Sequence, residues 1–208
     1  MKKTVVIIMA LAMVLCFAAC GDSGASDEGQ AEPAAEPNAG IEGIVFTMPD
    51  GWEQTEDSEA NYVGYANPDS DFEVGVMSFD EEMIKMMKEE DPASPGTVQE
   101  YYEQLYALSD QELKDSNAEA YTTEVCGTEA KGQKVKKGDK GYVDIGTAWI
   151  SDGVCYDFWI VNSKAYDDNG NVLEDAAVLS DEDIAMYESV LASITSGDGT
   201  KFQPSDEE

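Results

Sequence analysis

The chain has 208 residues, and 44 acidic residues stand against 12 lysines, with no arginine and no histidine, for a formal net charge of −32. So negative a chain repels phosphate backbones, which excludes nucleic acid as a partner. The lack of histidine excludes a serine or cysteine catalytic triad and a conventional zinc site, whereas carboxylate chemistry and a calcium site of oxygen ligands remain open.

The first twenty residues predict export and lipid attachment. Two lysines at positions 2 and 3 precede an uncharged apolar run from Val5 to Leu15. This run is too short for a transmembrane helix and is typical of a signal peptide over residues 1–19. The stretch Phe17-Ala18-Ala19-Cys20 resembles a bacterial lipobox. The resemblance implies that Cys20 carries lipid, palmitate included, and anchors the chain at the extracytoplasmic face of the cell membrane.

Composition divides the exported chain into three parts. Residues 20–40 contain the lipidated cysteine and an acidic stretch without large apolar side chains, which predicts a disordered tether at the cell surface. Residues 41–195 have the composition and length of one folded domain. Residues 196–208 are predicted to be a polar, disordered tail.

The first half of the domain is predicted to contain strands and then helices. Alternating apolar residues over 44–48 end at a Pro-Asp-Gly turn, and a hairpin is expected over 61–79 around Asn67-Pro68-Asp69. Helical spacing follows over 80–91, with Asp80 as the cap. A second helix is expected over 97–109, starting at a capping box of Thr97 and Glu100.

The second half returns to strands and closes with a helix. A strand over 120–127 is followed by a lysine-rich connection, and a hairpin over 141–164 turns at Ser151-Asp152-Gly153. Ser180 and Asp183 start a helix over 179–194. Hairpins without long crossovers predict an α+β fold, an antiparallel β-sheet flanked by helices.

Several stretches resemble one known fold family. These are IVFTMPDGW, TVQEYYEQL, TTEVCGTEA, the aromatic hairpin and the closing YESVLASI. Together they are similar to the PsbP-like fold, which also includes the Ran-binding Mog protein and small bacterial lipoproteins. The resemblance covers residues 41–194 and implies an α/β/α sandwich. It implies no catalytic residues, because members of the family act as accessory subunits, adaptors or chaperones.

Three groups of residues are candidate sites. Cys126 and Cys155 lie on predicted strands of an exported protein, so a disulfide and two separate thiols are both open, although an intervening strand favours the thiols. The acidic stretch 167–171 invites a calcium interpretation, but its spacing does not match an EF-hand loop, and an exposed turn explains it better. No metal site or cofactor is predicted from it.

The third group is the lysine-rich connection. It contains Lys131, Lys134, Lys136, Lys137 and Lys140. These lysines are either a docking point for an anionic partner or the protection of an edge strand and turn against aggregation.

The function predicted from these features is that of a non-enzymatic, membrane-anchored lipoprotein. It would act as an accessory or interaction module with a protein partner of unknown identity. The alternative is a lipoprotein that binds a cation such as calcium, or a small ligand. A carboxylate-based hydrolase would need two acidic residues that converge in a cleft, and the sequence alone does not single out such a pair among 44.

Overall fold

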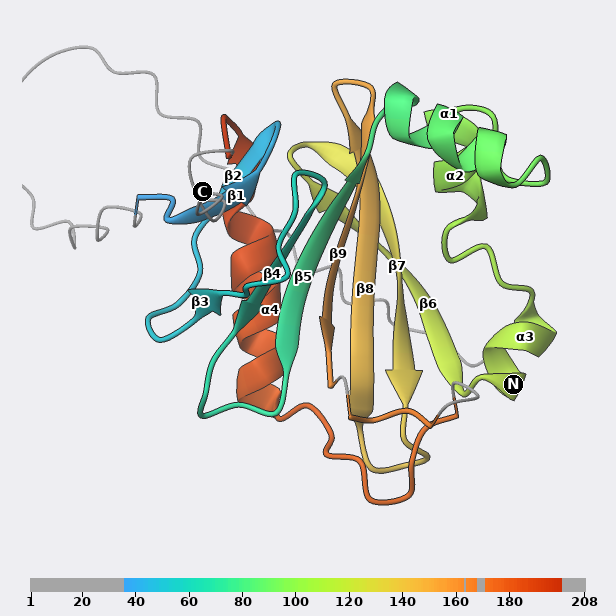
Figure 1. Ribbon diagram of the computed structural model, residues 1–208. Coiled ribbons are helices and arrows are strands. Elements are labelled where there is room, and N and C mark those ends of the chain that lie inside the picture. Colours follow the sequence, from blue (N-terminus) through green and yellow to red (C-terminus); the bar gives the residue numbers. More distant parts are fainter. Residues whose placement is uncertain (1–35, 163, 168–170, 200–208) are drawn as a thin grey trace, which may run out of the picture. The chain divides into compact units, whose positions relative to one another are not determined.

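The computed structural model describes residues 36–162, 164–167 and 171–199 (Figure 1). The predicted signal peptide, Cys20 and most of the predicted tether lie outside these residues, as does the tail from residue 200 on. Among the described residues, no helix is long and apolar enough to cross a bilayer.

In the described part of the chain, seven antiparallel strands form the main sheet in the order β3-β4-β5-β9-β8-β7-β6. The strands are β3 (Glu53–Gln54), β4 (Tyr62–Ala66), β5 (Glu73–Phe79), β6 (Ala118–Val125), β7 (Thr128–Lys136), β8 (Tyr142–Ser151) and β9 (Val154–Val161). Three short strands, β1 (Ala39–Ile41), β2 (Ile44–Phe46) and β10 (Thr195–Ser196), form a second sheet.

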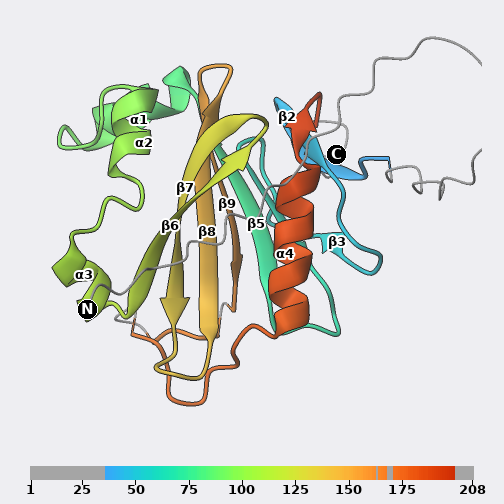
Figure 2. The ribbon, with the colours of Figure 1, turned by 180° about the vertical axis from the view of Figure 1, so that it is seen from behind.

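Helices lie on both faces of the main sheet. The long helix α4 (Asp181–Ser193) runs along one face, and α1 (Glu81–Glu90) and α2 (Val98–Gln104) lie at one end of the other (Figures 1 and 2). The short helix α3 (Asp110–Asp115) lies beside the edge strand β6. The predicted fold class, α+β with an antiparallel sheet flanked by helices, is confirmed.

The face under α4 holds the main core. Tyr187 of α4 is 1% exposed, and its hydroxyl donates to the carbonyl of Phe158 at 3.0 Å. The same hydroxyl lies 2.6 Å from the Thr147 hydroxyl, so the polar tip of the ring is satisfied inside the core. Ser180 and Asp183 form the predicted capping box at the start of α4.

Both ends of the predicted domain extend further than expected. Ala39 and Gly40 belong to β1 rather than to the predicted tether, and the Gly40 amide donates to the Tyr65 hydroxyl at 3.1 Å. Ser196 belongs to β10, which pairs with β2, rather than to the predicted tail. Small and polar residues at these positions form strands because neighbouring strands supply hydrogen-bond partners, which composition does not reveal.

The predicted helix over 97–109 is wrong in its second half. The helix ends at Gln104 with Leu105 as its C-cap, and Tyr106 adopts a positive φ of 54°. Thr97 caps it as predicted, but the Glu100 carboxylate accepts from the Gly96 amide instead of completing a capping box. A second capping box, Ser109 with Glu112, then starts α3.

The prediction that the lysine-rich stretch is a connection is also wrong, because most of the stretch forms strand β7. Residues 131–135 pair with β6 on one side and β8 on the other, and Lys136 pairs with β8. The edge strand at this end of the sheet is therefore β6, and β7 lies inside it. Only residues 137–141 form the turn to β8.

Candidate functional site

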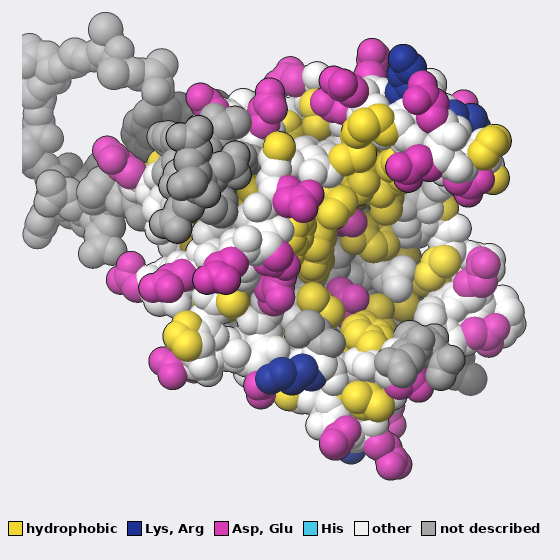
Figure 3. Space-filling view, viewed as in Figure 1, with side chains coloured by type: hydrophobic (Ala, Val, Ile, Leu, Met, Phe, Trp, Pro, Cys, Tyr) yellow, Lys and Arg dark blue, Asp and Glu magenta, His cyan; other side chains and the backbone are white. Residues whose placement is uncertain are grey.

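One face of the main sheet is only partly covered. The helices α1 and α2 pack over the end of β5 and the β8–β9 hairpin, through a cluster that contains Phe79, Ile84 and Val98. Beyond them the face is hollowed, and hydrophobic side chains gather along its middle (Figure 3). The hollow contains a recess of about 310 Å³.

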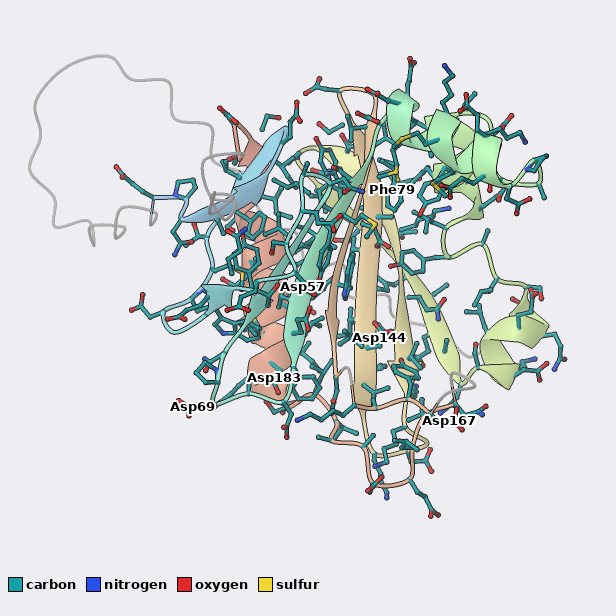
Figure 4. The ribbon with its side chains drawn as sticks, in the orientation of Figure 1. Asp57, Asp69, Phe79, Asp144, Asp167 and Asp183 are labelled. Carbon is teal, nitrogen blue, oxygen red and sulfur yellow. The ribbon has the colours of Figure 1, made fainter. Side chains whose placement is uncertain are left out.

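The recess is lined by alternate residues of three neighbouring strands. The lining residues are Gln133 and Val135 of β7, Asp144 and Gly146 of β8, Asp157, Trp159 and Val161 of β9, and Tyr106 from the segment after α2. Alternate residues of a strand point to the same face, so these side chains share the open face while their neighbours face α4. Figure 4 labels Asp144 on β8, in the middle of the sheet.

Glycines make room for two aromatic rings on this face. Trp159 pairs with Gly75 on β5 and with Gly146 on β8. The indole ring lies where a side chain of Gly75 would lie, and the Tyr106 ring does the same at Gly146. Tyr62 stacks near the indole, with ring centroids 6.0 Å apart and planes 12° apart. The two glycines thus allow both aromatic rings to lie close against the strands.

Two carboxylates of the recess are held by tyrosines. The Tyr106 hydroxyl donates to Oδ1 of Asp157 at 2.6 Å. The Tyr166 hydroxyl donates to Oδ2 of Asp144 at 3.2 Å, from the loop after β9. Within the described residues, no lysine lies within ion-pair distance of either carboxylate.

Burial without a counter-charge makes these acids unusual. Desolvation raises the pKa of Asp157 to about 6, against the hydrogen bond from Tyr106, which lowers it. Desolvation likewise raises the pKa of Asp144 to about 6, and the hydrogen bond from Tyr166 lowers it. The charge of Asp144 adds to the increase in the pKa of Asp157.

The predicted docking lysines do not form one patch. Lys131 lies on the open face, where its Nζ is 4.5 Å from the centroid of the Tyr102 ring. Lys134 points to the opposite face, 4.0 Å from Glu188 of α4, and Lys136 pairs with Glu119.

The two lysines of the turn are placed differently again. Lys137 donates to the carbonyl of Ala176, and Lys140 is exposed. Strand alternation divides the three lysines of β7, Lys131, Lys134 and Lys136, between the two faces of the sheet.

The two candidate cysteines are separate. Cys126 lies in the turn between β6 and β7, where its thiol contacts the carbonyl of Ile194 at 3.3 Å. Cys155 lies on β9 and is fully buried, and β7 and β8 lie between the two positions. Both are free thiols, so the disulfide that the sequence left open is not formed.

The predicted acidic turn is described only at its ends. Asp167 accepts hydrogen bonds from the Asn171 backbone and side chain, and residues 168–170 lie outside the described residues. Among the residues that the structure describes, no three acidic or cysteine side chains come together as metal ligands would.

A larger recess of about 520 Å³ lies between α1, α2 and the tip of the β8–β9 hairpin. Its lining includes Ile84, Val98 and Ile150, with Glu81 and Lys85 at its rim. The smaller recess, by contrast, combines two acids of raised pKa with two aromatic rings. Perturbed groups in a cleft mark a functional site more often than an apolar gap does, so the smaller recess is the candidate site.

Sequence reasoning missed the residues of this recess. A signal was present, because Asp144 lies between Val143 and Ile145, and Asp157 lies between Tyr156 and Phe158. An acid in the middle of an apolar strand is a place to look for function, but only the strand order shows that these two share one recess.

No family model matches the chain, and no curated protein matches its sequence. The solved structures similar to it include a cyanobacterial PsbP, CyanoP, from Synechocystis, with 14% identity and a TM-score of 0.41 over 81% of this chain and 98% of that one. A protein from Bacteroides thetaiotaomicron has 14% identity and a TM-score of 0.39 over 78% of this chain. The match spans about half (49%) of the length of the Bacteroides protein.

Proposed function

We propose that this protein is a membrane-anchored lipoprotein of the extracytoplasmic face that acts as a non-enzymatic interaction module with a PsbP-like domain. Its anchor would be Cys20, and the partly covered face of the main sheet would hold a partner protein. The observation that carries the proposal is the recess on this face, in which Trp159, Asp144 and Asp157 meet and to which no lysine of the described residues supplies a counter-charge.

Binding explains the recess better than acid–base catalysis does. A hydrolase that works with two carboxyls needs one protonated and one ionised, so their surroundings push the two pKa values apart. Here burial raises the pKa of Asp144 and of Asp157 in the same direction and to about the same value of 6. Both acids are also held by tyrosine hydroxyls, an arrangement that fixes their orientation for recognition.

A cation- or ligand-binding lipoprotein is the second candidate. The two carboxylates without a counter-charge favour it. Calcium fits less well than an organic cation, because calcium takes six to eight oxygen ligands and the described residues gather no third acid at this site. A melting temperature that rises with millimolar calcium but not with sodium would favour the calcium form of this candidate.

Lipid attachment is tested by labelling cells with an alkyne analogue of palmitate. Label is expected on the unaltered chain and on Cys16→Ser, and its loss is expected for Cys20→Ser. The Cys16 variant is the matched control, because it changes a neighbouring cysteine of the same segment. Label that persists in Cys20→Ser would overturn the assignment of Cys20.

The interaction role is tested by photo-crosslinking in intact cells. A photoreactive amino acid replaces Gln133, at the rim of the recess, or Glu188, on the α4 side of the sheet. One dominant protein adduct at position 133 and none at 188 would support a partner on the open face. Absence of any protein adduct at both positions would overturn the interaction role.

A further inference from the structure

The recess on the open face has an aromatic wall and an acidic floor, and its chemistry defines what can occupy it. Each carboxylate uses one oxygen to accept from a tyrosine, Oδ1 in Asp157 and Oδ2 in Asp144. Among the described residues, the second oxygen of each has no hydrogen-bond donor. Both acids line the recess. The recess therefore offers two separate acceptors to one ligand.

Among the described residues, no lysine forms an ion pair with either carboxylate of this recess. Lys131, on the same face, is placed over the Tyr102 ring beside α2. Lys137, at the far end of β7, donates to the carbonyl of Ala176. The remaining lysines of the strand, Lys134 and Lys136, pair with acids on the opposite face. Burying carboxylates without a cation is costly, so an outside cation supplies the counter-charge that the described lysines do not provide.

The aromatic wall favours a flat cation over a compact one. Trp159 lines the recess beside both acids, and the Tyr106 ring closes the side over Gly146. A guanidinium group stacks on an indole and presents several N–H donors in one plane, whereas an ammonium is a strongly hydrated point charge. The volume of about 310 Å³ is on the order of ten water molecules, enough for the end of one arginine side chain.

We propose that the recess binds the guanidinium group of an arginine side chain presented by a partner protein, with Asp144 and Asp157 as acceptors and Trp159 as the stacking surface. The partner is not a second copy of this chain, because the chain contains no arginine. The net charge of −32 steers a basic segment toward the domain. This inference rests on the proposed interaction role and names the chemistry of its ligand.

Calorimetry on the full chain in detergent tests the proposal with defined probes. The probes are the pentapeptide acetyl-Gly-Gly-Arg-Gly-Gly-amide, its lysine counterpart, its citrulline counterpart and agmatine. Citrulline has the shape of arginine without the charge, so it separates charge recognition from fit. We expect the arginine peptide to bind at least tenfold more tightly than the citrulline peptide and several-fold more tightly than the lysine peptide.

Substitutions locate the binding. In Asp144→Asn/Asp157→Asn, affinity for the arginine peptide is expected to fall at least tenfold, and in the matched control Asp69→Asn it should stay within twofold. Asp69 lies on the exposed turn between β4 and β5, away from the recess (Figure 4). The indole NMR signal of Trp159 should shift on titration with the arginine peptide in the unaltered chain only.

Each contrary result has a distinct meaning. Equal affinity for arginine and citrulline peptides in the unaltered chain overturns the proposal, even when a variant fails to fold. Tighter binding of agmatine than of the peptide overturns the protein source of the guanidinium. If the arginine peptide does not bind while crosslinks at position 133 persist, the ligand chemistry is wrong and the interaction role stands.

Discussion

The hydroxyl of Tyr106 lies 2.6 Å from Oδ1 of Asp157, and Tyr106 reaches it from a backbone with a φ of 54°. A left-handed conformation is costly for a tyrosine, so a tertiary contact has to hold it. The hydrogen bond to a buried carboxylate is such a contact, and it also ends the helix that the sequence predicts through residue 109. One residue thus sets both the local backbone and the chemistry of the recess.

Replacing Tyr106 with phenylalanine should remove the only hydroxyl that the described residues provide to the Asp157 carboxylate. The hydrogen bond lowers the pKa of Asp157, so the pKa should rise in the variant, as measured by carboxyl carbon NMR. Unfolding in urea at pH 7 should show a loss of about 1–3 kcal/mol, typical of a hydrogen bond to a charged group. The loss should be smaller at pH 4.5, where Asp157 is protonated.

Tyr102→Phe is the matched control for this experiment. The Tyr102 hydroxyl donates to the carbonyl of Glu129 at 3.4 Å from an exposed position, so its loss should change stability by less than about 0.5 kcal/mol. Equal losses in the two variants, or a pKa of Asp157 that does not move, would contradict the role of Tyr106.

The stability of the domain should depend on pH through Asp144 and Asp157. Each has a folded pKa of about 6 against 3.8 for the free side chain. The folded state therefore binds more protons than the unfolded state between these values, and stability falls as pH rises from about 4 to 6. The full loss, at most roughly 3 kcal/mol for each acid, is present above pH 6 and absent below about pH 4.

Asparagine variants isolate this contribution. Asp157→Asn should match the unaltered chain at pH 4 and exceed its stability at pH 7 by about 1–2 kcal/mol, because the amide is buried without charge. Asp144→Asn should behave in the same way. The charge of Asp144 contributes to the raised pKa of Asp157, so the two variants are expected to be non-additive. The other groups that interact electrostatically with Asp157 are Tyr101, Tyr106, Tyr121, Cys155 and Tyr187. If the stability difference between a variant and the unaltered chain is the same at pH 4 and pH 7, titration of the replaced acid is not its cause.

The sequence was sufficient where local rules decide the structure. The Asn67–Ser70 turn, the Asp152-Gly153 turn, and the caps at Asp80 and Ser180 all come from turn and capping chemistry and are found as predicted. Prediction from the sequence failed where pairing with residues distant in the chain decides the structure. The lysines of β7 look like a connection, but pairing with β6 and β8 makes them a strand.

The candidate site could not be predicted from the sequence for the same reason. Asp144 and Asp157 are 13 positions apart on two strands, and only the register of β8 with β9 brings them to one face. Tyr106 comes from a segment that periodicity assigns to a helix, and the capping box of Ser109 was the one local sign that a helix restarts there. Which side chains converge depends on the order of the strands in the sheet, and a single sequence does not reveal that order.

Gly146→Ala should disturb the recess without touching a charged group. An added methyl group at this position collides with the hydroxyl and ring of Tyr106. The ring cannot move without breaking the hydrogen bond from Tyr106 to Asp157. Overpacking of this kind costs about 1–3 kcal/mol, measured by urea unfolding. In a Tyr106→Ala background the same substitution should cost much less, because the colliding ring is gone.

Gly96→Ala serves as the control for Gly146→Ala. An added methyl group there would lie 3.4 Å from Glu100 Oε2, an ordinary contact at an exposed position. Its effect should stay within about 0.5 kcal/mol. A cost of Gly146→Ala that is unchanged in the Tyr106→Ala background would show that the close approach of Tyr106 is not the cause.

The two cysteines of the domain should differ in their access to alkylating reagents. Cys126 is exposed at the β6–β7 turn, whereas Cys155 is fully buried between the sheet and the helices α1 and α2. Burial raises the pKa of both thiols, to about 12 for Cys155, so both react slowly, and access then decides the order. Iodoacetamide on the folded chain without reductant should modify Cys126 first, as read by mass spectrometry of peptides.

Denaturant separates burial from a disulfide as the cause of protection at Cys155. A buried thiol becomes reactive once the domain unfolds, even when no reductant is present, so both cysteines should be modified fully in urea. A disulfide would leave both unmodified in urea until reductant is added. Cys126→Ser provides the matched control, because it should leave the protection of Cys155 unchanged if the two thiols are independent, and it should free Cys155 in urea if they are bridged.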